Sequence, residues 1–125
     1  MRSRVGHRMP LARTGIGKAL MLDDTQEEWQ RLYEVSLPAG GKNQFWPQHP
    51  EQSWEQFQQR MIDYVAGGYA FDLEDNEPSI RCVAAPIRDA SKRIVAGISI
   101  ASTVPYMPLE KMAELIPLIL SLIHI

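Results

Sequence analysis

The chain has 125 residues, of which 45% are hydrophobic and 22% are charged, which suits one soluble globular domain and leaves little room for two. The formal net charge of −2 argues against electrostatic binding of nucleic acid over the whole surface, so any DNA contact has to come from elsewhere. The single cysteine, Cys82, cannot form an internal disulfide and has no Cys/His set at metal-ligand spacing beside it, which fits a reducing cytoplasm.

Neither end of the sequence has the pattern of a targeting or membrane-spanning segment. The basic residues Arg13 and Lys18 interrupt every apolar run among residues 1–22, so no signal-peptide core is expected. The run LIPLILSLIHI, residues 115–125, is apolar but far short of the ~20 residues that a membrane span needs. We therefore expect no membrane contact.

Two helices are predicted before the first long loop. A short one covers residues 15–22, where Thr14 supplies the capping hydroxyl. The next covers residues 25–37, where Thr25 and Glu28 have the spacing of a capping box and the apolar residues form one stripe.

A third helix is predicted after a surface loop. Prolines and glycines in residues 38–52 prevent long regular structure there. Ser53 and Gln56 then form a second capping box, and the glycine pair at 67–68 stops the helix. Its apolar positions follow at intervals of three and four: Trp54, Phe57, Met61 and Val65.

The second half of the chain changes to the two-residue period of strands. Residues 80–87 and 94–101 are rich in β-branched side chains, and the segment RDASK that joins them predicts an antiparallel hairpin. Gly97, Ser99 and Ala101 share one face of the second strand, which leaves room either for a closely packed helix or for a ligand. An amphipathic helix starts after Pro108, and Pro117 with the apolar residues after it is expected to spoil it.

The stretch TGIGK, residues 14–18, raises the question of a phosphate-binding loop. A Walker-type loop needs a glycine where Ala12 stands and a serine or threonine where Ala19 stands, so this function is excluded. One remaining interpretation is an anion site at the start of a helix, where the free backbone amides and the helix dipole favour a negative charge. The alternative is the start of a helix that binds no ligand.

Two further features have chemical alternatives. Cys82 is either a nucleophile, with one of the three histidines as its base, or a buried and inert thiol. The acidic stretch DLEDNE, residues 72–77, is either a site for acid/base chemistry or metal binding, or a solvated loop, and the loop is the default.

Two segments in a fixed order resemble a known family. RVGHRMPLARTGIGKALM, residues 4–21, and GYAFDLEDNEPSIRCVAAPIRDASKRIVAGISIAS, residues 68–102, resemble the C-terminal effector-binding domain of the IclR family of bacterial transcriptional regulators. Within that family the sequence looks closest to regulators of sugar-acid catabolism. The resemblance covers residues 4–116, nearly the whole chain.

The resemblance implies an α/β (α+β) fold of the GAF/PAS-like type, an antiparallel sheet flanked by helices. It implies a domain that binds a small organic acid, such as a 2-keto-3-deoxy acid or an aldonate, without catalysis, cofactor or metal. DNA would be bound only through an N-terminal winged helix-turn-helix outside this chain, and the intact protein would form a dimer or tetramer in the cytoplasm.

The resemblance also assigns the effector-binding positions. Gly15 and Ile16, which follow the threonine of the TGxGK-type motif, would offer backbone amides to the ligand carboxylate. The other positions are Asp72 and Ser99 for hydroxyl or keto oxygens, Cys82 in the pocket lining, and Met9 and Ile80 in the apolar wall.

The sequence departs from the family pattern at three positions and at both ends. Ala101 replaces a serine, while Ser79 and Lys92 replace glycines, the latter at a cost of up to ~1 kcal/mol if the backbone needs a positive φ. We expect residues 1–119 to be a partial effector-binding domain whose first strands precede it, and residues 120–125 to be a non-native tail.

Two other functions remain open from the residues alone. One is a small cysteine-dependent hydrolase that uses Cys82, and the other is a stand-alone GAF-like interaction module.

Overall fold

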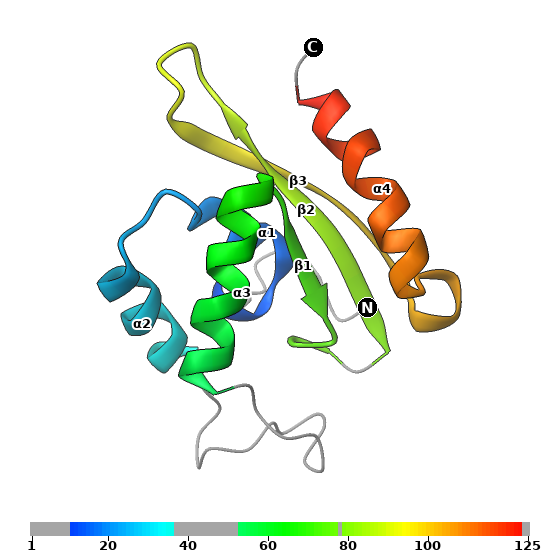
Figure 1. The fold of residues 1–125 in the computed structure, drawn as a ribbon, viewed down its shortest axis with the longest axis horizontal. Coiled ribbons are helices and arrows are strands. Elements are labelled where there is room, and N and C mark those ends of the chain that lie inside the picture. Colours follow the sequence, from blue (N-terminus) through cyan, green and yellow to red (C-terminus); the bar gives the residue numbers. More distant parts are fainter. Residues whose placement is uncertain (1–10, 37–52, 78, 124–125) are drawn as a thin grey trace, which may run out of the picture.

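The computed structural model describes residues 11–36, 53–77 and 79–123. These residues form a three-stranded antiparallel sheet, and Figure 1 shows helices on both of its faces. The strands β1 (Ala70–Leu73), β2 (Ile80–Arg88) and β3 (Ile94–Thr103) lie in the order β1-β2-β3. The expectation of an antiparallel sheet flanked by helices is confirmed.

One face of the sheet carries the first three helices. They are α1 (Gly15–Leu20), preceded by the 3-10 turn η1 (Leu11–Arg13), α2 (Gln26–Val35) and α3 (Trp54–Gly67). The helix α1 lies directly on the three strands, α3 contacts β1, and α2 packs against α3 and η1 (Figure 1). The core on this side includes Ala19, Trp29, Phe57 and Met61.

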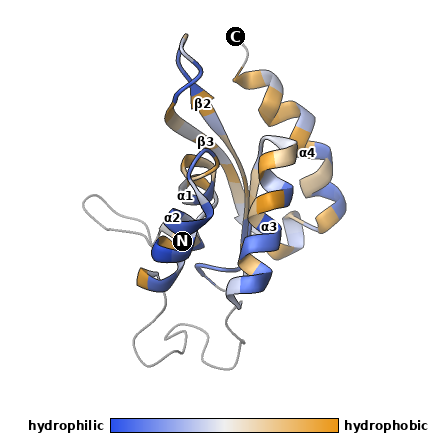
Figure 2. Ribbon diagram, turned by 60° about the vertical axis from the view of Figure 1, so that its left-hand side comes forward, coloured by the Kyte–Doolittle hydropathy of each residue, from blue (hydrophilic) through white to orange (hydrophobic). Residues whose placement is uncertain are grey.

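The other face is covered by α4 (Leu109–Leu122), which follows the 3-10 turn η3 (Val104–Tyr106). A second core cluster lies between this helix and the sheet and contains Val83, Ala85, Met107, Met112 and Ile119. Figure 2 shows that α4 is hydrophobic along most of its length. No helix in the described ranges has the length and apolar character needed to cross a membrane.

The predicted helix starts are confirmed by their caps. Thr25 and Glu28 make both hydrogen bonds of a capping box, and Ser53 and Gln56 make the same pair. The helix α3 ends at Gly68, whose φ of 77° is the left-handed conformation that glycine adopts without strain. The loop predicted over residues 38–52 lies outside the described residues.

Two elements differ from the sequence prediction. The strand β1 was not predicted, because its four residues are too short for a clear pattern and its pairing partner lies farther along the chain. The prediction that Pro117 spoils the last helix is wrong, since α4 continues through it to Leu122. Pro117 is exposed, and Ile119 beyond it is fully buried against the sheet, so core packing offsets the lost backbone hydrogen bond.

Candidate functional site

The first turn of α1 lies close against the sheet. The side chain of Thr14 accepts a hydrogen bond from the amide of Gly17 at 3.0 Å, which fixes the helix start. A Cβ atom placed on Gly15 would lie 2.6 Å from the Cys82 sulfur and 3.3 Å from the Ala84 Cβ. Only a glycine fits there, so the backbone of α1 reaches the sheet directly.

The small face of β3 receives this helix. Gly97 pairs with Pro86 and Ser99 pairs with Ala84, so these small residues share the face that α1 covers. A Cβ atom on Gly97 would lie 3.2 Å from a methyl carbon of Ile16. The interpretation of the small face as a seat for a closely packed helix is confirmed.

Cys82 lies at the centre of the site. It pairs with Asp72 across the sheet on one side and with Ala101 on the other, and its sulfur makes hydrogen bonds with the Ser99 side chain and the Gly15 amide. Burial and the nearby charge of Asp72 raise the pKa of its thiol to about 11. Four of the predicted residues, Gly15, Asp72, Cys82 and Ser99, therefore meet around one sulfur atom.

Asp72 is buried near the end of β1, and the pKa of its carboxyl group is shifted. Its Oδ1 atom accepts a hydrogen bond from the backbone amide of Asp75 at 2.8 Å. Burial raises the pKa of this carboxyl to about 6, with the charge of Asp75 adding to the rise and that of Lys18 opposing it. The carboxyl group can thus change its charge within a mildly acidic range.

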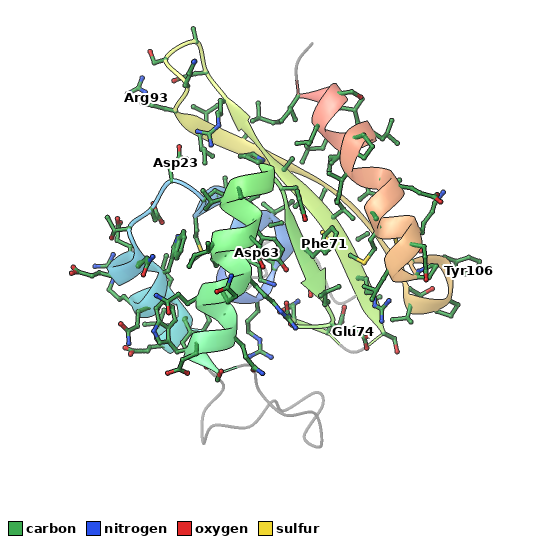
Figure 3. All side chains as sticks on the ribbon, in the orientation of Figure 1. Asp23, Asp63, Phe71, Glu74, Arg93 and Tyr106 are labelled. Atoms are coloured by element: carbon green, nitrogen blue, oxygen red, sulfur yellow. The ribbon has the colours of Figure 1, made fainter. Side chains whose placement is uncertain are left out.

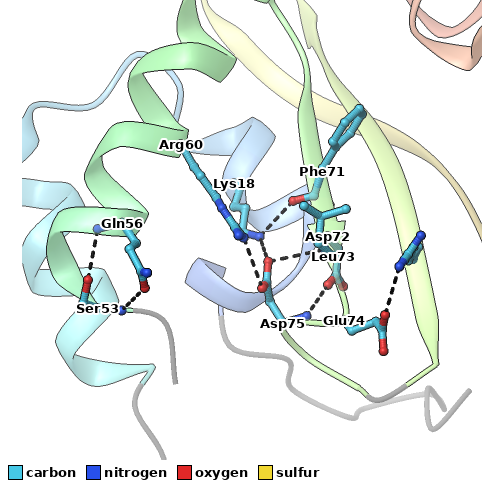
Figure 4. A network of polar contacts seen from close by, with 10 residues as sticks. Lys18, Ser53, Gln56, Arg60, Phe71, Asp72, Leu73, Glu74 and Asp75 are labelled. Carbon is cyan, nitrogen blue, oxygen red and sulfur yellow. Dashed lines mark hydrogen bonds and ion pairs between the residues drawn. The ribbon is translucent and has the colours of Figure 1, made fainter. Parts of the chain in front are cut away.

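A buried ion pair beside Asp72 was missed by sequence reasoning. The side chain of Lys18 is 1% exposed, its Nζ donates to the carbonyl of Phe71 at 2.8 Å, and it pairs with Asp75 (Figure 4). Arg60 of α3 approaches the same carboxylate, with 3.8 Å between Nη1 and Oδ1. The default expectation of a solvated acidic loop is therefore wrong for Asp72 and Asp75.

The charges of this pair stabilise each other. Burial alone would lower the pKa of Lys18, but the negative charges of Asp75 and Asp72 outweigh it and hold the pKa above its ordinary value. Burial likewise opposes ionisation of Asp75, yet the interaction with Lys18 lowers its pKa. Both groups are therefore charged at neutral pH. The available sequence signal was the single charge of Lys18 among Gly15, Gly17 and Ala19 in a short helix.

The remaining predicted residues lie at the edge of the site or outside the described ranges. Ile16 is exposed, although one of its methyl groups contacts β3 near Gly97. Ile80 is half-buried, two residues before Cys82 and on the same face of β2. Met9 lies outside the described residues. Within the described ranges no group of three or more His, Cys, Asp or Glu side chains is placed to hold a metal ion.

Comparisons with known proteins agree with this architecture. Residues 1–122 match the family described as bacterial transcriptional regulator IclR C-terminal. The chain is 31% identical over 100 residues to the HTH-type transcriptional regulator XynR of Escherichia coli K12. The aligned segment covers 80% of this chain and 38% of XynR. It is 32% identical over 102 residues to the HTH-type transcriptional regulator KdgR of Dickeya chrysanthemi, covering 81% of this chain and 32% of that one.

A solved structure shows the same fold. The repressor BlcR of Agobacterium tumefaciens superposes with a TM-score of 0.78 and 25% identity, over 98% of this chain and 48% of that one. The matched part of the chain spans 38% of the length of XynR and 32% of the length of KdgR. The family match over nearly the whole chain, together with this fold, means that the chain belongs to the C-terminal domain family of the IclR transcriptional regulators.

Proposed function

We propose that this chain is the ligand-sensing domain of a bacterial transcriptional regulator and that it binds a small sugar acid, such as a 2-keto-3-deoxy acid or an aldonate. The observation that carries the proposal is the meeting of the α1 start, Asp72 and Ser99 around Cys82. A helix start provides amides for a carboxylate, and the two polar side chains provide partners for hydroxyl or keto oxygens. A sugar acid has both kinds of group in one small molecule.

In this proposal each residue has one role. The ligand carboxylate accepts hydrogen bonds from the amides of Gly15 and Ile16, and it competes with the Cys82 sulfur for the Gly15 amide. Asp72 and Ser99 bind oxygens along the carbon chain. Ala101, opposite Cys82, presents a methyl group where a serine would add a hydroxyl, so it favours a ligand with no oxygen at that place.

The whole protein would couple this site to DNA. The relatives XynR and KdgR are named HTH-type transcriptional regulators, and each extends well beyond the segment matched here. We infer that an N-terminal winged helix-turn-helix binds DNA in the cytoplasm, and that effector domains pair into a dimer or tetramer. Acid binding at the α1 start would then change the affinity for DNA.

The two other functions considered from the sequence lack support. The family and the relatives are transcriptional regulators rather than enzymes. A nucleophilic cysteine needs a lowered pKa, whereas that of Cys82 is raised. A stand-alone interaction module likewise finds no counterpart among these relatives.

Isothermal titration calorimetry tests the proposal. The chain is titrated with 2-keto-3-deoxygluconate, gluconate and, as a neutral sugar, glucose. We expect heat of binding with at least one acid and none with glucose. Ser99→Ala should weaken binding by about 10-fold, corresponding to one lost hydrogen bond of ~1.4 kcal/mol. The control is Ser102→Ala, because Ser102 lies on the same strand but on the opposite face. Absence of heat with both acids contradicts the proposal.

A further inference from the structure

A buried lysine connects the start of α1 to the end of β1. Lys18 belongs to the same six-residue helix as Gly15, and its ammonium group contacts the Phe71 carbonyl and the Asp75 carboxylate. A buried ammonium group costs free energy unless it is paired and hydrogen-bonded. The contacts of Lys18 with Phe71 and Asp75 therefore hold α1 in its position beside the end of β1. Figure 4 shows Lys18 reaching from α1 to this end of the strand.

Asp75 connects the same lysine to Asp72. Its carboxylate binds Lys18 and lies 3.5 Å from the Leu73 amide, while its own backbone amide donates to Asp72 Oδ1 at 2.8 Å. The residue thus contacts the lysine with its side chain and the Asp72 carboxylate with its backbone. A shift of Lys18 or Asp75 would therefore move either the Gly15 amide or the Asp72 carboxylate relative to Cys82.

We propose that Lys18 and Asp75 are positioning residues of the effector site: their ion pair fixes the α1 start and the Asp72 carboxylate on either side of Cys82. This inference rests on the proposed function. The pair acts through Gly15 and Asp72 and does not itself touch the ligand. Pre-organised groups bind more tightly because their ordering is complete before the ligand arrives.

The charged groups around Asp72 determine how the loss of the Lys18–Asp75 ion pair would change the pH dependence of binding. The groups around it are Lys18 from α1, Asp75 from the loop after β1 and Cys82 from β2, while α3 contributes Tyr64 near Lys18 and Arg60 near Asp75. Without the lysine, Asp72 would face the charge of Asp75 with less compensation. Its ionisation, and any binding that requires it, would then need a higher pH.

The test uses the complete chain with three variants and one control. Lys18→Met and Asp75→Asn each break the pair, and the double variant removes both charges, so that neither partner of the pair is left as a buried charge without the other. The control is Arg88→Gln, which breaks an exposed ion pair with Asp23 of 2.5 and 2.9 Å. Figure 3 shows that Asp23 lies far from Glu74, which directly follows β1 and directly precedes Asp75.

Two quantities are measured. The first is the dissociation constant of 2-keto-3-deoxygluconate or gluconate between pH 5 and 8. The second needs no ligand: it is the rate at which iodoacetamide modifies Cys82, the only cysteine of the chain, corrected for the free energy of unfolding of each variant.

We expect each variant of the pair to weaken acid binding at neutral pH by about 10-fold or more, and Lys18→Met to move the acid midpoint of binding to higher pH. Cys82 should react about 10-fold faster in these variants, because the α1 start no longer covers it. Arg88→Gln should match the wild type in both measurements.

The outcomes separate this inference from the proposed function. If no acid binds to the wild type, the proposed function fails, and the labelling rates alone decide whether the pair holds α1 over Cys82. Wild-type labelling rates in the variants of the pair overturn the inference. A loss of affinity with an unchanged pH midpoint in Lys18→Met also overturns it, because that result indicates a merely structural role. If either single variant fails to fold, the double variant gives the result.

Discussion

Asp72 and Cys82 are directly paired residues of the antiparallel strands β1 and β2, and the charge of the first is one cause of the raised pKa of the second. Burial is the larger cause for both side chains, and it raises the pKa of Asp72 to about 6 and that of Cys82 to about 11. At neutral pH the pair therefore consists of a mostly ionised carboxylate beside a protonated thiol. The carboxylate can accept hydrogen bonds, and the thiol remains unreactive.

The first prediction concerns the reactivity of Cys82. A rise of the thiol pKa from 9.0 to about 11 leaves about 100-fold less thiolate at neutral pH, so iodoacetamide should react about 100-fold more slowly with the folded chain than with the unfolded chain. Asp72→Asn removes one cause of the shift and should speed the reaction. Rates are measured by mass spectrometry at pH 7.5, with the chain in denaturant as control. Equal rates in the folded and unfolded chains would contradict the raised pKa.

The second prediction concerns the pH dependence of stability. The pKa of Asp72 is 3.8 in an unfolded reference and about 6 in the folded protein, so the folded state binds more protons between these values. The free energy of unfolding therefore falls as the pH rises through this range, by up to about 3 kcal/mol from this group. Asp72→Asn should remove that fall, and urea unfolding of both proteins between pH 4 and 7 measures it.

Asp75 provides the contrast for this prediction. Its pKa is lowered, so its contribution to stability is present above 3.8 and is lost as the pH falls through its folded pKa. The contribution of Lys18, whose pKa is raised, is lost only above its ordinary value of 10.5. The Asp75 contribution therefore does not fall as the pH rises from 4 to 6, and that of Lys18 stays constant there, so neither can produce the fall expected from Asp72. Identical slopes for the wild type and Asp72→Asn in this range would show that the pKa of Asp72 is not raised.

The third prediction concerns the close approach of α1 to the sheet. An alanine in place of glycine ordinarily stabilises a helix interior by ~1 kcal/mol. Gly15→Ala should instead destabilise the chain by about 1–3 kcal/mol, because the new methyl group would lie 2.6 Å from the Cys82 sulfur.

A double variant isolates the cause of this loss. Cys82→Ala removes the sulfur and leaves the Ala84 Cβ, at 3.3 Å, as the nearest atom to the added methyl group. The cost of Gly15→Ala should therefore be smaller in the Cys82→Ala background than in the wild type. Urea unfolding of the four proteins gives the interaction energy, and strictly additive losses would show that the contact with sulfur is not the cause.

Local sequence signals predicted the helix starts and the hairpin, and distant contacts explain what was missed. The capping boxes at Thr25 and Ser53 depend on residues three positions apart, so the sequence contains the complete interaction. The burial of Lys18 depends on Asp75, 57 positions later, and no periodicity encodes that contact. The extension of α4 through Pro117 likewise depends on the packing of Ile119 against the sheet.

The candidate site likewise contains residues that were predicted from the sequence and contacts that were not. Gly15, Asp72, Cys82 and Ser99 were assigned through the family resemblance, and the sheet register brings them together around one sulfur atom. The binding roles of these residues stay predictions. The ion pair beside them was not predicted, since a charged residue in a short helix and an acidic loop are each ordinary surface features when read alone.

The last prediction concerns the hairpin turn, where Lys92 has a φ of 66°, in the left-handed region that non-glycine residues adopt at a cost. The turn holds this conformation because the Lys92 amide donates to the Asp89 carbonyl at 2.9 Å, and the Asp89 side chain accepts from the amides of Ser91 and Arg93. Lys92→Gly relieves the strain and keeps these backbone bonds, so it should raise the free energy of unfolding by up to about 1 kcal/mol.

The matched control for this variant is Ser91→Gly, in the same exposed turn but at a residue without a positive φ. That change adds only conformational freedom to the unfolded chain and should lower the free energy of unfolding by about 0.5–1 kcal/mol. Urea unfolding of the two variants and the wild type measures both differences. Equal losses in the two variants would mean that Lys92 is not strained, whereas opposite signs would assign the gain to its left-handed backbone.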